Sequence, residues 1–347
     1  MSGLDKMKAL KERSLSRVNS TFIDLLTSNN IGLKIFNSLA EPYIAGHSLE
    51  EGLANIERYF RHRRHSTVDV LGESSTEIEK ADDYLHNYKR IIDSLSLKNL
   101  NWGISSISLK PTAICAVNNG EPGLMEETPL KGRLEHIVSY AKAGGVDVTL
   151  DMEDSAWTDL SLDAAKYLWN NGYDNLGIVL QSRLNRTKED IQKILKRQEY
   201  KVPKDKIRVR AVIGIYIEPE NIATNNKPEA KERLIERVKE LFDAGVYVEV
   251  GTHDHQVINR IIDEVILPKG INPERFEFQF LKGIQNAYAI ERKLMGSGYK
   301  VRYYMPVEIN NGDGIPYMER RLKANPNLIL MGAKNMMQKM ISYSNGS

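Results

Sequence analysis

After residue 100 the sequence alternates between short runs of β-forming residues and amphipathic helical segments. Seven β-type runs occupy residues 103–109, 146–150, 176–180, 207–213, 246–250, 276–281 and 300–304, and residues 327–331 could supply an eighth. Apolar residues three and four positions apart predict helices in the intervals. Because strands that alternate with helices form parallel sheets, and eight such units in about 240 residues match the size of one closed barrel, we expect a (β/α)8 barrel.

A doubly wound open sheet is the alternative topology. Its nucleotide-binding form has a G-x-G-x-x-G motif directly after the first strand. The nearest match here, Gly296 and Gly298, follows a helical segment and lacks the third glycine, so the barrel is favoured. Before residue 100 we find helical patterns at 15–27, 31–40, 48–62 and 75–95, and nothing that alternates like a strand. We therefore expect a helical region over 1–99 and the barrel over 100–347.

Composition restricts the class of partner. The 48 Lys and Arg residues against 46 Asp and Glu residues give a net charge of +2, which provides no electrostatic reason to expect a nucleic-acid partner. The single cysteine, Cys115, cannot form an internal disulfide. No run of about 18 apolar residues predicts a membrane span, and no signal-like segment begins the sequence. A cytoplasmic protein is expected.

Polar residues follow the predicted strands, where a barrel places its active site. They are Lys110, Asp151 with Glu153, Gln181, Arg210, Thr252 with His253, Gln279 and Tyr304. Lys110 could bind a carboxylate or, if desolvated, form a Schiff base. Asp151 and Glu153 could pair with it, bind a metal or move protons. No compact ligand spacing supports a metal site, so we expect none.

The segment 314–325, GIPYMERRLKAN, places a tyrosine and two arginines on one helix face. Tyr317, Arg320 and Arg321 fall at positions i, i+3 and i+4. Guanidinium groups offer planar, bidentate donors that suit a carboxylate or phosphate. A solvated basic surface is the alternative interpretation, but the position after the strand VRYYMP favours a functional one.

These blocks, taken in order, resemble the proline dehydrogenase family, the flavoenzymes that oxidise L-proline. The matching segments are TVDVLGE (67–73), ISLKPTA (107–113), LDMED (150–154), GIVLQ (177–181), RAVIGIYIEP (210–219), VGTHD (250–254), FEFQFLKG (276–283) and the pair 301–306 with 317–325. The chain differs from the family's motifs in having Ile213 for a lysine, Arg183 for a tyrosine, Glu308 for a glycine, Asp254 for an asparagine and Ala324 for a glutamate.

The resemblance implies a distorted (β/α)8 barrel, TIM-like and preceded by helices, that holds FAD noncovalently. It assigns Lys110, Arg320 and Arg321 to the substrate carboxylate, and Glu73 to a pair with the first arginine that gates the site. Asp151, Leu281, Tyr304 and Tyr317 would line the substrate pocket. The implied FAD contacts are Gln181, Arg210, Gly214, Tyr216, Thr252, His253 and Gln279, with Arg210 near the flavin N5. Arg210, Asp151 and Tyr304 are the implied catalytic residues.

The implied reaction is the oxidation of L-proline to Δ1-pyrroline-5-carboxylate by hydride transfer to FAD, an oxidoreductase step of proline catabolism. Electrons would pass to a quinone-type acceptor, which allows a peripheral contact with a membrane, and the product to a separate pyrroline-5-carboxylate dehydrogenase. Two alternatives stay open. One is a Lys110-dependent aldolase or a metal-assisted lyase on a similar barrel. The other is a degenerate flavin-binding barrel that serves as an interaction module, which Ile213 and Ala324 favour.

Overall fold

Eight parallel strands form a closed barrel in the computed structural model, which describes residues 26–98, 100, 105–118, 121–122, 129–310 and 312–324. The strands follow one another around the barrel in the order β1-β10-β9-β8-β7-β6-β5-β2. Their bounds are β1 (His65–Val70), β2 (Ser105–Leu109), β5 (Asp147–Leu150), β6 (Leu176–Gln181), β7 (Arg208–Val212), β8 (Tyr247–Gly251), β9 (Phe276–Leu281) and β10 (Lys300–Val307). The predicted (β/α)8 barrel is confirmed.

One barrel strand lies where the sequence predicted only helices. Strand β1 pairs with β10 on one side and with β2 on the other, so it closes the barrel. The prediction that the region before residue 100 contains no strand is therefore wrong, and the barrel takes in part of the predicted helical region 1–99. The eighth strand expected at 327–331 lies outside the described residues.

The composition of β1 explains why its pattern was missed. Thr67 and Asp69 are completely buried, and their side chains contact Ser108 of the neighbouring strand β2 and Lys110, which follows it. Val68 and Val70 are equally buried and belong to the surrounding apolar core. Because the interior of this barrel is polar, a fully buried strand here carries serine, threonine and aspartate instead of a continuous apolar run.

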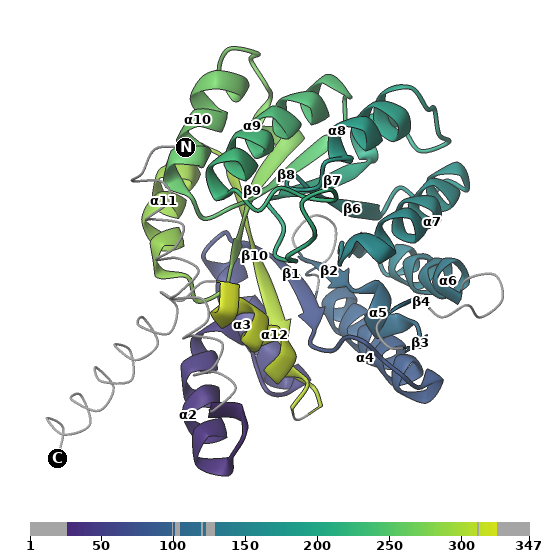
Figure 1. Cartoon of the computed structure of the whole chain (residues 1–347), viewed down its shortest axis with the longest axis vertical. Coiled ribbons are helices and arrows are strands. Elements are labelled where there is room, and N and C mark those ends of the chain that lie inside the picture. Colours follow the sequence, from purple (N-terminus) through teal and green to yellow (C-terminus); the bar gives the residue numbers. More distant parts are fainter. Residues whose placement is uncertain are drawn as a thin grey trace, which may run out of the picture.

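Helices cover the outside of the barrel (Figure 1). They are α2 (Asn30–Ala40), α3 (Leu49–Arg61), α4 (Ile78–Leu97), α5 (Pro111–Ile114), α6 (Pro129–Ala143), α7 (Thr158–Asn170), α8 (Thr187–Asp190), α9 (Lys227–Asp243), α10 (His255–Ile261), α11 (Gln285–Gly296) and α12 (Gly314–Ala324). A short antiparallel pair, β3 (Val117–Asn118) and β4 (Glu121–Pro122), lies beside the barrel. Among the described helices, none has the length and apolar character needed to cross a membrane.

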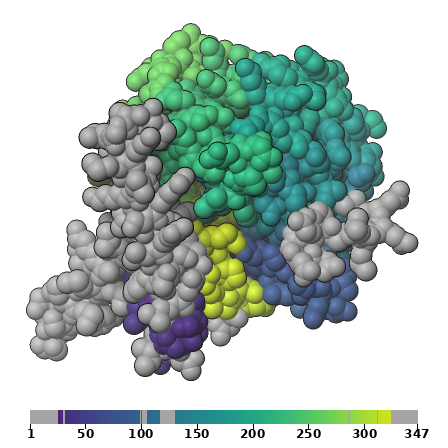
Figure 2. Space-filling view, in the orientation of Figure 1, coloured from purple at the N-terminus to yellow at the C-terminus, as the bar shows by residue number. Residues whose placement is uncertain are grey.

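A second, smaller apolar cluster positions α12. Phe36 and Leu39 of α2 share this cluster with Tyr317, Met318 and Leu322 of α12. Burial of a side chain such as Met318 or Leu322 contributes about 1.5–3 kcal/mol each. At its start the helix is capped by the Glu308 carboxylate, whose Oε1 accepts hydrogen bonds from the Gly312 N (3.0 Å) and the Gly314 N (2.9 Å). Figure 2 shows α12, in yellow, at the surface between the green and blue segments.

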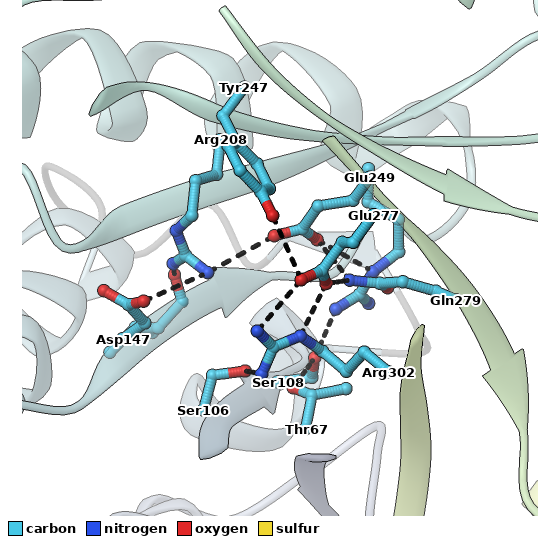
Figure 3. Close-up of polar contacts among 12 residues, drawn as sticks. Thr67, Ser106, Ser108, Asp147, Arg208, Tyr247, Glu249, Glu277, Gln279 and Arg302 are labelled. Carbon is cyan, nitrogen blue, oxygen red and sulfur yellow. Dashed lines mark hydrogen bonds and ion pairs between the residues drawn. The ribbon is translucent and has the colours of Figure 1, made fainter. Parts of the chain in front are cut away.

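Inside the barrel, a group of charged and amide side chains fills the amino-terminal half; we call Arg208, Glu249, Glu277, Gln279 and Arg302 the barrel floor (Figure 3). The Arg302 Nε and Nη2 donate to the two Glu277 carboxylate oxygens at 2.5 and 3.0 Å. Burial alone would raise the pKa of Glu277, but Arg302 lowers it to about 2. The Gln279 Nε2 joins Glu277 (2.6 Å) to Glu249 (2.8 Å). Each of these buried charges therefore has an opposite charge beside it.

Candidate active site

Lys110 lies buried at the carboxyl end of β2, where it binds an aspartate that the sequence did not single out. Its Nζ donates to both oxygens of Asp69 on β1, at 2.8 and 2.7 Å. Burial lowers the pKa of Lys110, but the charges of Asp69 and Asp151 outweigh burial and raise it above its usual value. Lys110 is therefore an ammonium group. Burial raises the pKa of Asp69. We call the surrounding carboxyl ends of the strands the barrel mouth.

Three predicted catalytic residues from different strands meet at the barrel mouth. The Asp151 Oδ1 accepts a hydrogen bond from the Arg210 Nη1 (2.8 Å), and its Oδ2 accepts one from the Tyr304 hydroxyl (2.7 Å). The Arg210 guanidinium lies 5.6 Å from the centre of the Tyr304 ring, and its Nη2 donates to the Ser108 Oγ (2.9 Å). Asp151 thus fixes the orientation of both side chains.

Helix α12 brings Tyr317, Arg320 and Arg321 to the barrel mouth. Both terminal nitrogens of Arg320 donate to the two carboxylate oxygens of Glu73, so the pair implied by the resemblance is present. Burial, and then the neighbouring Arg321, lower the pKa of Arg320 to about 10. The Arg321 guanidinium lies 5.1 Å from the Tyr317 ring centre. Burial raises the pKa of Tyr317, and the charges of Arg321 and Lys110 oppose this shift.

Apolar atoms line the same place. Leu281, Tyr304 and Tyr317, which the sequence assigned to a substrate pocket, share the cluster that joins α2 to α12. Tyr216 reaches this group from the segment after β7, because the Arg320 guanidinium lies 5.9 Å from its ring centre. A small ligand with one anionic end would find cations on one side and ring surfaces on the other.

The ends of β6 and β7 form a second part of the site. The Gln181 Nε2 donates to the backbone oxygen of Glu153 (2.7 Å). Gly214 has a φ of +102°, and a Cβ at this position would come within 2.3 Å of the Gln181 Oε1, so glycine is required. The Glu153 carboxylate accepts from the Thr112 N and Oγ1 at 2.9 and 2.8 Å, and burial raises its pKa to about 7.

The remaining predicted residues lie at the ends of β8 and β9. The His253 Nε2 accepts a hydrogen bond from the Leu281 N (2.8 Å). Burial, followed by the charge of Arg321, lowers the pKa of His253 to about 3, so the ring is neutral and its proton lies on Nδ1. The Thr252 Oγ1 accepts from the Asp254 N (3.2 Å). The Gln279 amide nitrogen donates within the barrel floor.

The side chains at the ends of β6 and β7 fit an anionic or hydrogen-bonding cofactor such as FAD. The side chains of Gln181 and Arg183 converge on Gly214. The Nε atom of Arg183 is buried and has no hydrogen-bond partner among the described residues. For a metal ion, no group of three or more His, Cys, Asp or Glu side chains in the described part of the chain is placed to hold one. Cys115 is buried, and burial raises the pKa of its thiol to about 12.

Comparisons with known proteins agree with these features. A model of the proline dehydrogenase family matches residues 52–328. The chain is 29% identical to a proline dehydrogenase of Deinococcus radiodurans over 299 residues, which cover 84% of this chain and 88% of that protein. It is also 29% identical to proline dehydrogenase 1 of Bacillus subtilis over 301 residues, covering 86% of this chain and 91% of that one.

A solved structure shows the same fold. Proline utilization A of Bdellovibrio bacteriovorus superimposes with a TM-score of 0.76 at 24% identity, over 89% of this chain. The chain spans 37% of that much longer protein.

Proposed function

Because the chain belongs to the proline dehydrogenase family, we propose that it oxidises L-proline to Δ1-pyrroline-5-carboxylate by hydride transfer to FAD. The observation that carries this proposal is the set of three cations, Lys110, Arg320 and Arg321, at the barrel mouth, where Arg321 lies over the Tyr317 ring and Arg320 pairs with Glu73. Proline is small, so much of its binding energy has to come from its carboxylate, and charge-assisted hydrogen bonds are the strong ones.

The residues of the barrel mouth suit both ends of this substrate. Arg320 and Arg321 would bind the carboxylate, and the substrate would compete with Glu73 for Arg320. Lys110 adds a fixed positive charge that Asp69 keeps in place. Leu281, Tyr304 and Tyr317 would pack against the pyrrolidine ring, and the Tyr304 hydroxyl is oriented by its bond to Asp151. We call Lys110, Arg320 and Arg321 the carboxylate clamp. Together with the three apolar side chains, it would select a small ring that carries a carboxylate.

For the cofactor we propose contacts from Gln181, Arg210, Gly214, Tyr216, Thr252, His253 and Gln279. When bound, FAD supplies the hydride acceptor, and the protein orients the substrate and adjusts the electrostatics. Arg210 would provide a positive charge beside the reacting ring, held by Asp151 and Ser108. The neutral His253 would offer its Nδ1 proton to a cofactor oxygen, because its Nε2 already accepts from Leu281.

We propose a quinone-type compound as the next electron acceptor, with the chain in the cytoplasm and in peripheral contact with the membrane that holds this acceptor. The product would pass to a separate pyrroline-5-carboxylate dehydrogenase. Homology to bifunctional PutA proteins, such as that of Escherichia coli at 24% identity over half of this chain, supports this link between the two reactions.

The aldolase alternative conflicts with the state of Lys110. A Schiff base requires a neutral amine. Here two carboxylates keep the lysine protonated, with Asp69 bonded to it at both oxygens. The degenerate-barrel alternative has Ile213 in its favour, and only an experiment on the protein separates it from an active enzyme.

The visible absorption spectrum of the purified protein tests the proposal. We expect flavin bands that bleach when L-proline is added without oxygen, and no bleaching with pyrrolidine, which lacks the carboxylate. A protein that fails to bind FAD contradicts the proposed function. Flavin bands that L-proline leaves unchanged would favour the degenerate module.

A further inference from the structure

Arg183 is a buried cation at the ends of β6 and β7 to which none of the assigned roles applies. We infer that Arg183 binds an anionic oxygen of the flavin cofactor, and that it provides in this chain the positive charge that the family's motif places three residues after Arg210. This inference rests on the proposed function, because it takes a flavin to be the ligand.

The position of Arg183 directs it toward the proposed cofactor site. It lies in the turn that follows β6, two residues after Gln181. The Cδ of Arg183 and the Oε1 of Gln181 are the nearest neighbours of a Cβ built on Gly214, at 3.1 and 2.3 Å. Arg183 thus packs against the backbone of Gly214 and lies next to Gln181, and both of these residues are proposed cofactor contacts.

Its polar contacts leave the charge without compensation. The Arg183 Nη1 donates to the backbone oxygen of Tyr216 (2.5 Å), and the Nε has no hydrogen-bond partner in the described part of the chain. Among the described residues no carboxylate forms an ion pair with it. Burial lowers the pKa of Arg183 more than the charge of Glu218 raises it, and the Glu218 carboxylate accepts hydrogen bonds from the Ser155 N (2.6 Å) and Oγ (3.1 Å).

Burial makes this arrangement unfavourable in the protein alone. Arg183 is 8% exposed, and burial lowers the pKa of its guanidinium. Removing a charge from water is costly unless an opposite charge or several hydrogen bonds replace the water. A bound anion would supply the opposite charge, and one of its oxygens would accept a hydrogen bond from the Arg183 Nε.

The sequence around Arg183 supports an exchange of residues between neighbouring strand ends. The family's motif has a lysine at the position of Ile213 and a tyrosine at the position of Arg183. In this chain the two segments are adjacent, because the Arg183 N donates to the Ile213 backbone oxygen (3.1 Å). The aliphatic Ile213 packs against the apolar core. The family's motif and this chain therefore each have one positive charge at this junction. In the motif it follows β7, and in this chain it follows β6.

The experiment measures FAD binding to the apoprotein by fluorescence titration for the native chain, Arg183→Met and Arg183→Lys. Arg186→Met is the matched control. It makes the same substitution three residues further along the chain, at an arginine that already pairs with Asp159 and Asp190. We expect Arg183→Met to weaken FAD roughly tenfold or more, since a charge-assisted bond contributes about 1.5–3 kcal/mol. Arg183→Lys should retain most of the affinity, and the control all of it.

Two further measurements identify the contact. If Arg183 binds the diphosphate, Arg183→Met leaves riboflavin affinity unchanged; if it binds the flavin ring, riboflavin weakens too and the midpoint potential falls. Both results support the inference. The inference is overturned if Arg183→Met leaves both the FAD affinity and the midpoint potential at their native values, or if Arg183→Lys loses as much FAD affinity as Arg183→Met. It is also overturned if Arg183→Met lowers the thermal midpoint of the apoprotein as much as it lowers that of the holoprotein. A native chain that binds no FAD would instead overturn the proposed function, and this inference with it.

Discussion

The barrel floor and the barrel mouth contain similar buried charges but pair them differently. On the floor, Arg302 has Glu277 and Arg208 has Glu249 as ion partners. At the mouth, Lys110, Arg210 and Arg320 also have carboxylate partners, but Arg321 contacts the Tyr317 ring, and neither it nor Arg183 forms an ion pair among the described residues. A cation without a carboxylate partner favours an anion from outside. The difference assigns a structural role to the floor and ligand binding to the mouth.

The two regions also shift the pKa of a buried glutamate in opposite directions. Arg302 holds Glu277 of the floor at a pKa of about 2, although burial opposes this. Glu153 of the mouth faces a hydroxyl and a backbone N–H instead of a cation, and burial raises its pKa to about 7. A guanidinium in direct contact outweighs desolvation, and neutral donors do not.

The largest effect is expected from breaking the floor. Glu277→Gln leaves Arg302 buried without its counter-charge, and removal of one partner of a buried pair costs about 3–5 kcal/mol. We therefore expect a loss of this size in the free energy of unfolding, measured by urea denaturation. Glu189→Gln, which removes one end of the exposed Lys193–Glu189 pair, should leave the free energy of unfolding close to that of the native protein. Equal losses of unfolding free energy in both variants would show that the buried Arg302–Glu277 pair stabilises the fold no more than an exposed pair does.

A mouth cation should behave in the opposite way, with a large effect on binding and little on stability. Arg321→Met removes a donor to the substrate carboxylate, so proline should bind about 10- to 150-fold more weakly, the equivalent of about 1.5–3 kcal/mol. Urea denaturation should show no loss comparable to that of Glu277→Gln. The measurement is flavin reduction as a function of proline concentration.

Pyrrolidine is the control for this prediction. It has no carboxylate, so the native enzyme should reduce its flavin poorly with it and Arg321→Met should be little worse. If Arg321→Met slows flavin reduction by pyrrolidine as much as by proline, Arg321 supports the fold or the flavin, and the proposed role in binding the carboxylate is wrong.

The pH dependence of stability distinguishes the two glutamates. Glu153 has a folded pKa of about 7 against an ordinary value of 4.5. Between these values the folded state binds more protons than the unfolded state, so this group lowers stability as pH rises from about 4.5 to 7. In Glu153→Gln this part of the slope, on the order of 3 kcal/mol in total, should disappear. Urea denaturation at several pH values measures it; a parallel profile for both proteins would contradict the shifted pKa.

Much of this arrangement was predictable from the sequence where apolar periodicity is strong. Strands such as β6 and β9 carry β-branched and aromatic residues that pack against the outer helices, and the polar residues that follow them were identified as site residues. Lys110, Asp151 and Arg320 do lie at the barrel mouth. The i, i+3, i+4 spacing also predicted that Tyr317, Arg320 and Arg321 share a face of α12.

The rest depended on the polar barrel interior. Asp69, the partner of Lys110, lies on β1, which alternates polar inward residues with valines too few to mark a strand. Its position inside the matched segment TVDVLGE (67–73) was the available signal. Arg183 was noted only as a departure from the family's motif, because a sequence does not show that a surface-type residue is buried without a carboxylate.

The smallest effect is expected at the loop that joins β10 to α12. The His47 Nδ1 contacts the Glu308 Oε2 (2.6 Å) and its Nε2 contacts Glu41 (3.1 Å). Burial lowers the pKa of His47, but its bonds to the two glutamates outweigh this and raise it above 6.5.

The stabilisation by His47 is therefore fully present below pH 6.5 and is lost as pH rises through the folded pKa. The ring is 42% exposed and water screens the pair, so we expect less than about 1 kcal/mol. The thermal midpoint of His47→Gln should lie below that of the native protein at pH 5.5 and meet it at pH 8.5. A difference between His47→Gln and the native protein that persists unchanged at pH 8.5 would show that His47 acts through packing and not through its charge.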